Sequence, residues 1–200
     1  GKVEGVPDMA RVTVGVTTEA ETAADALAEN SRRLTAVFAA LADAAIEDRD
    51  MQTSNLTLSP KWNDRLQNSR QSGRITGFVV SNVLRINVRD LTKLGGILDQ
   101  VVSSGANQFQ GLSFGLQDPD PAQDAARRAA VIDAARKAAL YAEAAGVKLG
   151  RIVSIEENGG VRGPITMSMD MRAFAAESVP IAQGEVSVGA TVTIVYELEE

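Results

Sequence analysis

One stretch decides the fold class, RITGFVVSNVLRINVR at residues 74–89. In an extended chain, successive side chains point to opposite faces. One face of this stretch carries large apolar side chains, and the other face carries most of the polar ones. This alternation predicts a long β-strand with one face against a core. The apolar face comprises Phe78, Val80, Leu84, Ile86 and Val88.

Further strands and two helices surround this strand in the sequence. Alternating apolar residues predict the strands, and apolar residues at helical spacing predict the helices. The segment at residues 61–74 is polar and charged, which indicates a long hairpin tip. The resulting order, β-α-β-β-α-β, predicts an α+β fold with a ferredoxin-like core. In chain order, the predictions are a strand at 9–17, a helix at 19–45, strands at 51–60 and 74–89, a helix at 91–103 and a strand at 109–116.

The remainder of the chain predicts a long third helix and two further antiparallel strands. The helix is expected from Asp120, as its N-cap, to Ala145, with Gln123 closing a capping box and Gly146 ending it. Strands are expected at 151–157 and 185–198, and the second is long enough to pair with more than one neighbour. Between them lies an expected loop at 158–184. We expect one domain over residues 1–200, with a possible subdivision into 1–118 and 119–200.

Composition excludes several classes of function. The chain has 200 residues, a net charge of −6, no cysteine and no histidine. Disulfides, zinc–thiolate sites, thiolate nucleophiles and Ser-His-Asp triads are therefore excluded. No long basic run favours nucleic-acid binding, and no apolar run is long enough to span a bilayer. We expect a protein that is not an enzyme and that uses no cofactor.

Two groups of residues are candidates for a site. Thioethers are good ligands for Cu(I), so Met167, Met169 and Met171 could bind copper, although an adaptable apolar contact explains them better. Trp62 could anchor an interface or cover the base of its own hairpin. The self-assembly candidates are Trp62, Arg65, Met169 and Phe174.

Charged residues offer two further interpretations. Glu47, Asp48 and Asp50 could perform acid–base chemistry or bind calcium, but the EF-hand spacing is missing and a charged turn is favoured. The hairpin tip is basic and could contact the acidic carboxyl-terminal end of another subunit; a solvated tip is the preferred interpretation. The basic residues are Lys61, Arg65, Arg70 and Arg74, and the acidic ones are Glu197, Glu199 and Glu200.

Ordered motifs along nearly the whole chain give a family resemblance. They run from Pro7-Asp8-Met9-Ala10 through Ser81-Asn82 and Gly105-Ala106-Asn107 to Gly184-Glu185. Taken in this order, they resemble the SIMPL-domain family (DUF541). The resemblance implies an exported protein, periplasmic or associated with the outer membrane, whose signal peptide has been removed. It also implies a homo-oligomer linked to oxidative-stress protection, and it assigns no catalytic residue.

One position departs from the family pattern. Related sequences tend to have Gly before the Ile that follows the first helix, whereas Ala45 precedes Ile46 here. If that position needs a left-handed backbone, alanine costs about 1–2 kcal/mol there.

Three functions remain open from the sequence. The first is a non-catalytic exported protein that assembles with copies of itself and contributes to envelope or stress protection. The second is a periplasmic binding module for a small ligand, a metal or a peptide in segment 158–184. The third is an enzyme using carboxylates or tyrosine, which the absence of histidine and cysteine disfavours.

Overall fold

The structure is a computed structural model that describes residues 1–62, 74–157, 162–166 and 181–199. Contacts divide the chain into two compact units. Unit 1 comprises Gly1–Asp8, Phe114–Ala173 and Ala182–Glu200, and unit 2 comprises Met9–Ser113 and Phe174–Ile181. Helices and antiparallel sheets occur together, so the α+β class is confirmed.

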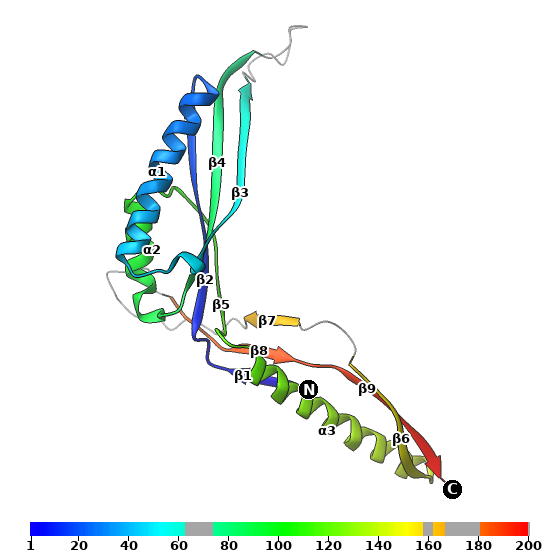
Figure 1. The fold of residues 1–200 in the computed structure, drawn as a ribbon. Helices are drawn as coiled ribbons and strands as arrows, with labels where there is room; N and C mark the ends of the chain where they lie inside the picture. The colour runs from blue at the N-terminus through cyan, green and yellow to red at the C-terminus, as the bar shows by residue number, and fades with distance from the viewer. Residues whose placement is uncertain (63–73, 158–161, 167–180, 200) are drawn as a thin grey trace. The chain divides into compact units, whose positions relative to one another are not determined.

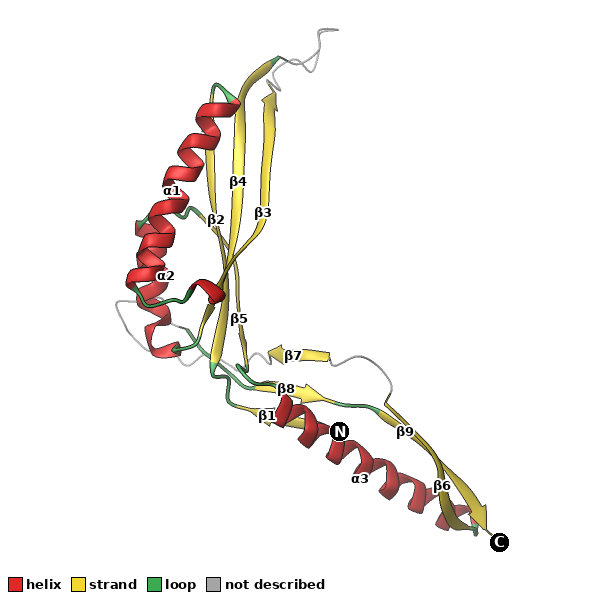
Figure 2. Cartoon of the chain, in the orientation of Figure 1, coloured by secondary structure: helices red, strands yellow, loops and turns green. Residues whose placement is uncertain are grey.

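Unit 2 is a four-stranded sheet with two helices (Figures 1 and 2). The strands lie in the order β3-β4-β2-β5, so β4 and β2 are central and β3 and β5 are edges. Helices α1 and α2 cover one face of this sheet. The elements are β2 (Met9–Ala20), α1 (Ala23–Asp43), η1 (Asp48–Asp50), β3 (Met51–Trp62), β4 (Ile75–Val88), η2 (Leu91–Lys93), α2 (Leu94–Ser103) and β5 (Gln108–Gly115).

The stretch that decides the fold is β4, and its apolar face forms the core as expected. Val80, Leu84 and Ile86 are at most 1% exposed, whereas Phe78 is only half-buried. Across the sheet, β2 contributes its own alternate residues, because Val12 pairs with Ile86 and residues paired in register share a face. The core of unit 2 therefore lies between this face and the buried side of α1.

One polar side chain caps α1, and another fixes the helix against the sheet. The Thr22 hydroxyl caps the helix by accepting from the Asp25 amide at 3.1 Å, so the helix begins later than the expected residue 19. Asn30 is 1% exposed, and its amide donates to the Val16 carbonyl at 2.8 Å and to the Val80 carbonyl at 3.4 Å. Buried polar groups need such partners, so Asn30 links the helix to β2 and β4.

Ala45, which stands where glycine is usual before Ile46, adopts a left-handed backbone conformation. Its φ is 62°, and it is the only non-glycine residue with positive φ in the described chain. The Ile46 amide donates to the Leu41 carbonyl and the Ala45 amide donates to the Ala42 carbonyl. These two bonds define a Schellman motif with alanine where glycine is usual.

Ala45→Gly is expected to raise the free energy of unfolding by about 1 kcal/mol, because glycine has no Cβ to strain the left-handed backbone. The matched control is Gly146→Ala. Gly146 ends α3 in the same motif, with a φ of 73°. No atom lies within 4 Å of a Cβ built there, so its expected loss of similar size reports backbone strain alone. Urea unfolding measures both; a neutral Ala45→Gly would show that Ala45 is unstrained.

Unit 1 contains a long helix and two small sheets (Figure 1). One sheet has the order β1-β8-β7, and the other is the antiparallel pair β6-β9. Helix α3 packs on strands of both sheets, and its buried residues are alanines. The elements are β1 (Lys2–Gly5), α3 (Asp120–Ala145), β6 (Lys148–Glu157), β7 (Arg162–Thr166), β8 (Val186–Gly189) and β9 (Val192–Glu199).

Unit 1 corrects three sequence expectations about strands. Strand β1 lies before the first expected strand and pairs with β8 through Lys2 and Gly189. Strand β7 occupies part of the expected loop at 158–184. The expected final strand is two strands, interrupted between Gly189 and Val192. Its predicted pairing with more than one neighbour is confirmed, because β8 pairs with β1 and β7 while β9 pairs with β6.

The start of α3 also differs from the expectation. Pro119 is at the N-cap, with no side-chain capping bond, and Asp120 is already helical. The Asp118 carboxylate accepts from the Asp120 amide at 3.1 Å, so Asp118 satisfies the amide that begins the helix. The predicted end of the helix at Gly146 is confirmed.

Candidate functional site

The edge strand β3 exposes nearly all of its residues. Every residue except Met51 is exposed, although the strand is twelve residues long. Its large apolar side chains are about half accessible, with Leu56 at 54%, Leu58 at 50% and Trp62 at 55%. An exposed, long, apolar edge strand is a template for pairing with another chain. Strand β3 is therefore a candidate for an interaction site.

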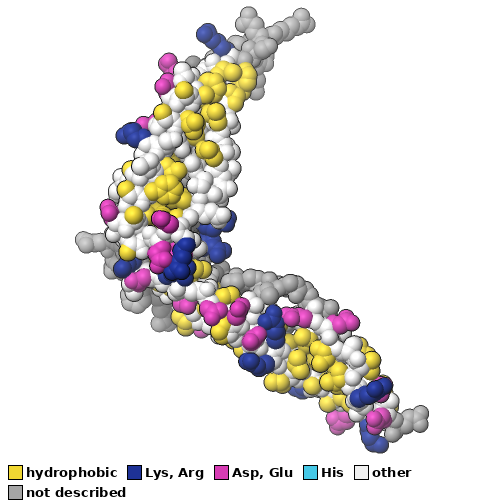
Figure 3. All heavy atoms as spheres, in the orientation of Figure 1, with side chains coloured by type: hydrophobic (Ala, Val, Ile, Leu, Met, Phe, Trp, Pro, Cys, Tyr) yellow, Lys and Arg dark blue, Asp and Glu magenta, His cyan; other side chains and the backbone are white. Residues whose placement is uncertain are grey.

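The leucines of β3 lie on the helix-bearing face of the sheet. Leu58 pairs with Val80 in register, and Val80 is buried beneath α1. Helix α1 makes few contacts with β3, and Leu56 and Leu58 stay accessible. An open groove of about 500 Å³ lies between α1 and the start of β3. Figure 3 shows hydrophobic side chains gathered over this side of unit 2. The groove is lined by Thr35, Phe38, Ala39, Ala42, Asp48 and Met51.

Unit 1 exposes apolar side chains from both its helix and its β6–β9 pair (Figure 3). On α3, Ile132 is 69% exposed and Tyr141 is 72% exposed. These two residues are nine positions apart, so they lie on opposite sides of the helix. The apolar residues thus surround α3 rather than forming one stripe. Strands β6 and β9 add Ile152, Val153, Ile155, Val195 and Leu198, each at least 46% exposed.

Of the predicted site residues, the structure describes Trp62. It ends β3, opposite Ile75 of β4, which is 42% exposed. Arg65, Phe174 and the three methionines at 167, 169 and 171 lie outside the described residues. The copper site and most of the assembly candidates therefore stay predictions.

One residue at each end of the proposed basic–acidic contact already has a partner within the chain. Lys61 forms an ion pair with Glu19 of β2. Glu197 accepts two bonds from Arg151, at 2.7 and 2.8 Å, and this bond lowers the pKa of the Glu197 carboxyl. These surface pairs leave less unpaired charge for the predicted contact between subunits.

The acidic cluster after α1 contains a structural ion pair. Asp50 is 4% exposed, and its two oxygens accept from the Arg89 guanidinium at 2.7 and 2.8 Å. Hydrogen bonding from Arg89 lowers the pKa of Asp50 despite its burial. Glu47 pairs instead with Arg49 at 2.7 Å, on the surface. No group of three potential metal-ligating His, Cys, Asp or Glu side chains occurs in the described part of the chain.

Several polar side chains in or near the family motifs form hydrogen bonds with the backbone of another segment or of the next turn. The Asp8 carboxylate accepts from the Gln117 amide at 2.7 Å. The Asn107 side chain accepts from the Thr17 amide at 2.8 Å and donates to the Thr17 carbonyl at 2.7 Å, which fixes the start of β5 to β2. Asp90 accepts from the Thr92 amide, which begins the turn before α2. These side chains have structural roles that sequence spacing alone does not reveal.

Asn82 is the exception among the motif residues. It is 8% exposed on the core face of β4, and its Oδ1 has no hydrogen-bond partner in the described chain.

Asn82→Leu replaces this buried acceptor with an apolar side chain of similar size, and we expect it to raise the free energy of unfolding by about 1–2 kcal/mol. Urea unfolding measures this change in the free energy of unfolding, and the dependence of that free energy on urea concentration should stay the same. Asn87→Leu is the control, because Asn87 Oδ1 accepts from Arg11 and its replacement should not stabilise. Loss of stability in Asn82→Leu would contradict the expectation.

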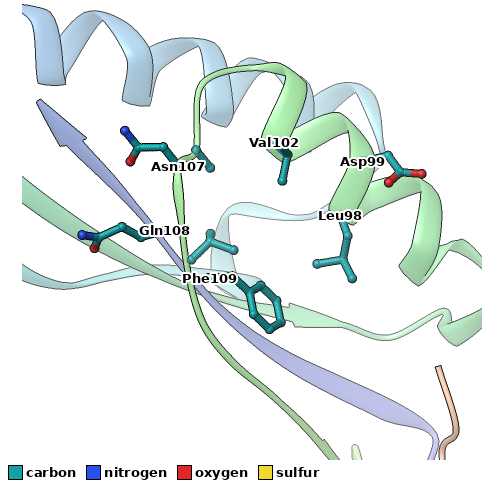
Figure 4. Close-up of a pocket in the computed structure, with 8 residues that line it drawn as sticks. Leu98, Asp99, Val102, Asn107, Gln108 and Phe109 are labelled. Atoms are coloured by element: carbon teal, nitrogen blue, oxygen red, sulfur yellow. The ribbon is translucent and has the colours of Figure 1, made fainter. Parts of the chain in front are cut away.

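A pocket of about 360 Å³ lies in unit 2 between α2 and the strands β2 and β5 (Figure 4). Leu98 and Val102 of α2 and Phe109 of β5 supply much of its apolar lining. The polar side chains beside them are already bonded, Asn107 to Thr17 and Gln108 to Ser81. The pocket therefore offers apolar surface and the Asp99 carboxylate, without a set of catalytic groups.

The comparisons identify the family. The sequence model of SIMPL, described as a protein of unknown function (DUF541), matches residues 1–196, and the chain belongs to this family. The chain is 37% identical to the 26 kDa periplasmic immunogenic protein of Brucella melitensis, over all of the chain and 82% of the relative. It is 26% identical to the uncharacterized protein YggE of Escherichia coli K12, over 98% of the chain and 80% of the relative.

No helix within the described ranges is both long enough and apolar enough to cross a bilayer. Helix α3 has the length, at 26 residues, but it carries charged side chains throughout.

Proposed function

We propose that this chain is a non-catalytic, exported protein that assembles with copies of itself in the periplasm and contributes to envelope or stress protection. One observation carries the proposal, the apolar surface of unit 1. A two-stranded ribbon is marginally stable by itself in water, and among the described elements it is the alanine-rich helix α3 that packs on β6 and β9. Helix α3 adds exposed apolar side chains of its own, Ile132 and Tyr141 among them. Neighbouring copies would bury this surface.

The periplasmic setting is supported by the Brucella relative, whose name states that location and which matches the whole chain. Stress protection is the finer part of the proposal and derives from the family resemblance.

The absence of catalysis is supported by chemistry. The chain has no histidine and no cysteine, which removes the commonest general base and the thiolate nucleophile. Hydrogen bonds lower the pKa of each carboxylate that shows a shift among the described residues; arginines donate them to Asp50 and Glu29, whereas Thr92 donates to Asp90 and Lys137 to Asp133. A general acid or base at neutral pH needs the opposite shift.

The test of self-assembly is the native mass measured over a hundredfold range of protein concentration by sedimentation and light scattering. A defined oligomer that dissociates on dilution, or a stable one of fixed size, is expected. A monomer at every concentration would refute the proposal.

The copper-binding alternative rests on the Met-x-Met-x-Met spacing at 167–171. Thioether ligands select Cu(I). Titration of Cu(I) into the protein and into a variant with all three methionines replaced by alanine decides it. Equal weak binding by both proteins would remove this alternative.

A further inference from the structure

We propose that β3 pairs antiparallel with β3 of a second copy, about a two-fold axis at Thr57, so that two unit 2 sheets join into one. This inference rests on the proposed self-assembly and names one of its interfaces. The β3 edge has no strand partner in the described chain, and open N–H and C=O groups on an edge favour pairing with another strand.

Features that usually protect an edge strand are placed at both ends of β3 and not in its middle. Charged side chains, prolines and bulges discourage edge pairing. Strand β3 has a register shift between Thr53 and Asn55, and it has Pro60 near its other end. No charged residue occurs from Met51 to Pro60. The unprotected window is therefore residues 56–59, which contains both exposed leucines.

Pro60 indicates which backbone groups face the open edge. It lies opposite Phe78 within the β3–β4 ladder, and a proline in a strand places its nitrogen on the side without hydrogen bonds. The N–H and C=O of every second residue point the same way. Leu58 and Leu56 therefore direct their backbone groups to the open edge, together with the Pro60 carbonyl.

These constraints select the register. A two-fold axis at Thr57 places Leu56 opposite Leu58 of the partner subunit, and each such pair exchanges two backbone hydrogen bonds. Both leucines also lie on the same sheet face, so the pairing forms two Leu–Leu contacts. Moving the axis to Leu58 would place Pro60 opposite Leu56 and leave the Leu56 carbonyl without a donor.

The partner is a second copy because the window is complementary to itself. The paired strands bring no like charges together, since residues 51–60 are uncharged. Lys61, the nearest cation, is already paired with Glu19 of its own chain. The extended sheet would cover the leucines that α1 leaves accessible.

A single engineered cysteine tests the register, because the chain has no cysteine of its own. In Thr57→Cys, the two Cα atoms would lie about 4.5 Å apart across the axis, within disulfide range. The matched control Ser59→Cys lies on the same face and edge, with a separation of about 14 Å. Under mild oxidation, Thr57→Cys is expected to form at least tenfold more covalent dimer than Ser59→Cys.

A second variant tests the interface without oxidation. Leu58→Lys is expected to raise the dissociation constant of the interface at least tenfold with an unchanged circular dichroism spectrum, because Leu58 is already half exposed in one copy. Ala28→Lys, on the exposed side of α1, is the control and should change nothing.

The outcomes separate this inference from the proposed function. Two outcomes would overturn the β3 pairing and leave self-assembly standing. In the first, the protein is an oligomer but Thr57→Cys and Ser59→Cys cross-link equally slowly. In the second, a cross-link forms only when the two variants are mixed. A monomeric wild-type protein in which neither cysteine cross-links would overturn both.

Discussion

The double variant Ile132→Glu/Leu140→Glu is expected to weaken assembly by about a hundredfold or more. The two residues lie eight positions apart on α3, which is a spacing that shares one helix side, and they are 69% and 55% exposed. In a single copy they contribute little buried area. If neighbouring copies cover them, a carboxylate must lose its water there, at a cost of several kcal/mol. A loss of about 2.8 kcal/mol already corresponds to a hundredfold weaker association.

Sedimentation of the double variant beside the wild type measures this effect, and the midpoint of urea unfolding shows whether each copy stays folded. Ala28→Glu is the matched control, since it adds a carboxylate at an exposed helix position of unit 2. An unchanged oligomer in the double variant would exclude this side of α3 from the assembly, and the proposal would lose its main support.

Local chemistry explains what the sequence predicted correctly. The alternation in β4 is unambiguous because its apolar residues are large and, apart from Leu84, β-branched or aromatic. The end of α3 at Gly146 depends on residues within one helical turn. The expectation for Ala45 belongs to the same kind, because a helix that continues into a Schellman motif needs a left-handed residue at that position.

The missed strands depend on partners that are distant in the sequence. Strand β1 has four residues and forms because Lys2–Gly5 meets β8 nearly two hundred residues later. Strand β7 contains Gly163 and Pro164, which locally indicate a loop. The alternation of small and β-branched residues continues through Ala190 and Thr191, so nothing local marks where β8 ends and β9 begins.

The sequence could not predict that the apolar faces of β3 and α3 are exposed, and the reason is physical. Leu56 and Leu58 alternate as regularly as the buried residues of β4. Whether such a face is buried depends on how far α1 extends over the sheet, which is a tertiary property. Helix α3 poses the same problem, because its alanines predict close packing but do not say which larger residues stay uncovered.

Asp50→Asn is expected to lower the free energy of unfolding by about 2 kcal/mol at neutral pH. Asp50 is buried and accepts two bonds from Arg89, and an asparagine can accept only one of them while turning an N–H toward the other donor. Fully buried pairs lose about 3–5 kcal/mol when broken. The expected value is smaller, because the Arg89 side chain is 41% exposed and can return to water.

The pH dependence identifies the ion pair as the cause. The Arg89 bonds lower the pKa of Asp50 below its ordinary value of 3.8. A lowered pKa in the folded state contributes stability that is fully present above the ordinary value and is lost as the pH falls through the lowered one. The difference between wild type and Asp50→Asn should therefore be constant from about pH 5 to 8 and should shrink below about pH 4. Asp133, whose pKa is lowered to about 2 by Lys137 and Arg136, affects both proteins equally and cancels.

Urea unfolding of both proteins at pH 7, 5, 4 and 3 measures this difference. Asp48→Asn is the control, because Asp48 is an exposed carboxylate in the same short helix as Asp50. It should cost less than about 0.5 kcal/mol, the usual range for a surface substitution. A loss in Asp50→Asn that stays the same at pH 3 would assign the effect to packing rather than to charge. The cluster after α1 would then stabilise the fold without an ionised Asp50.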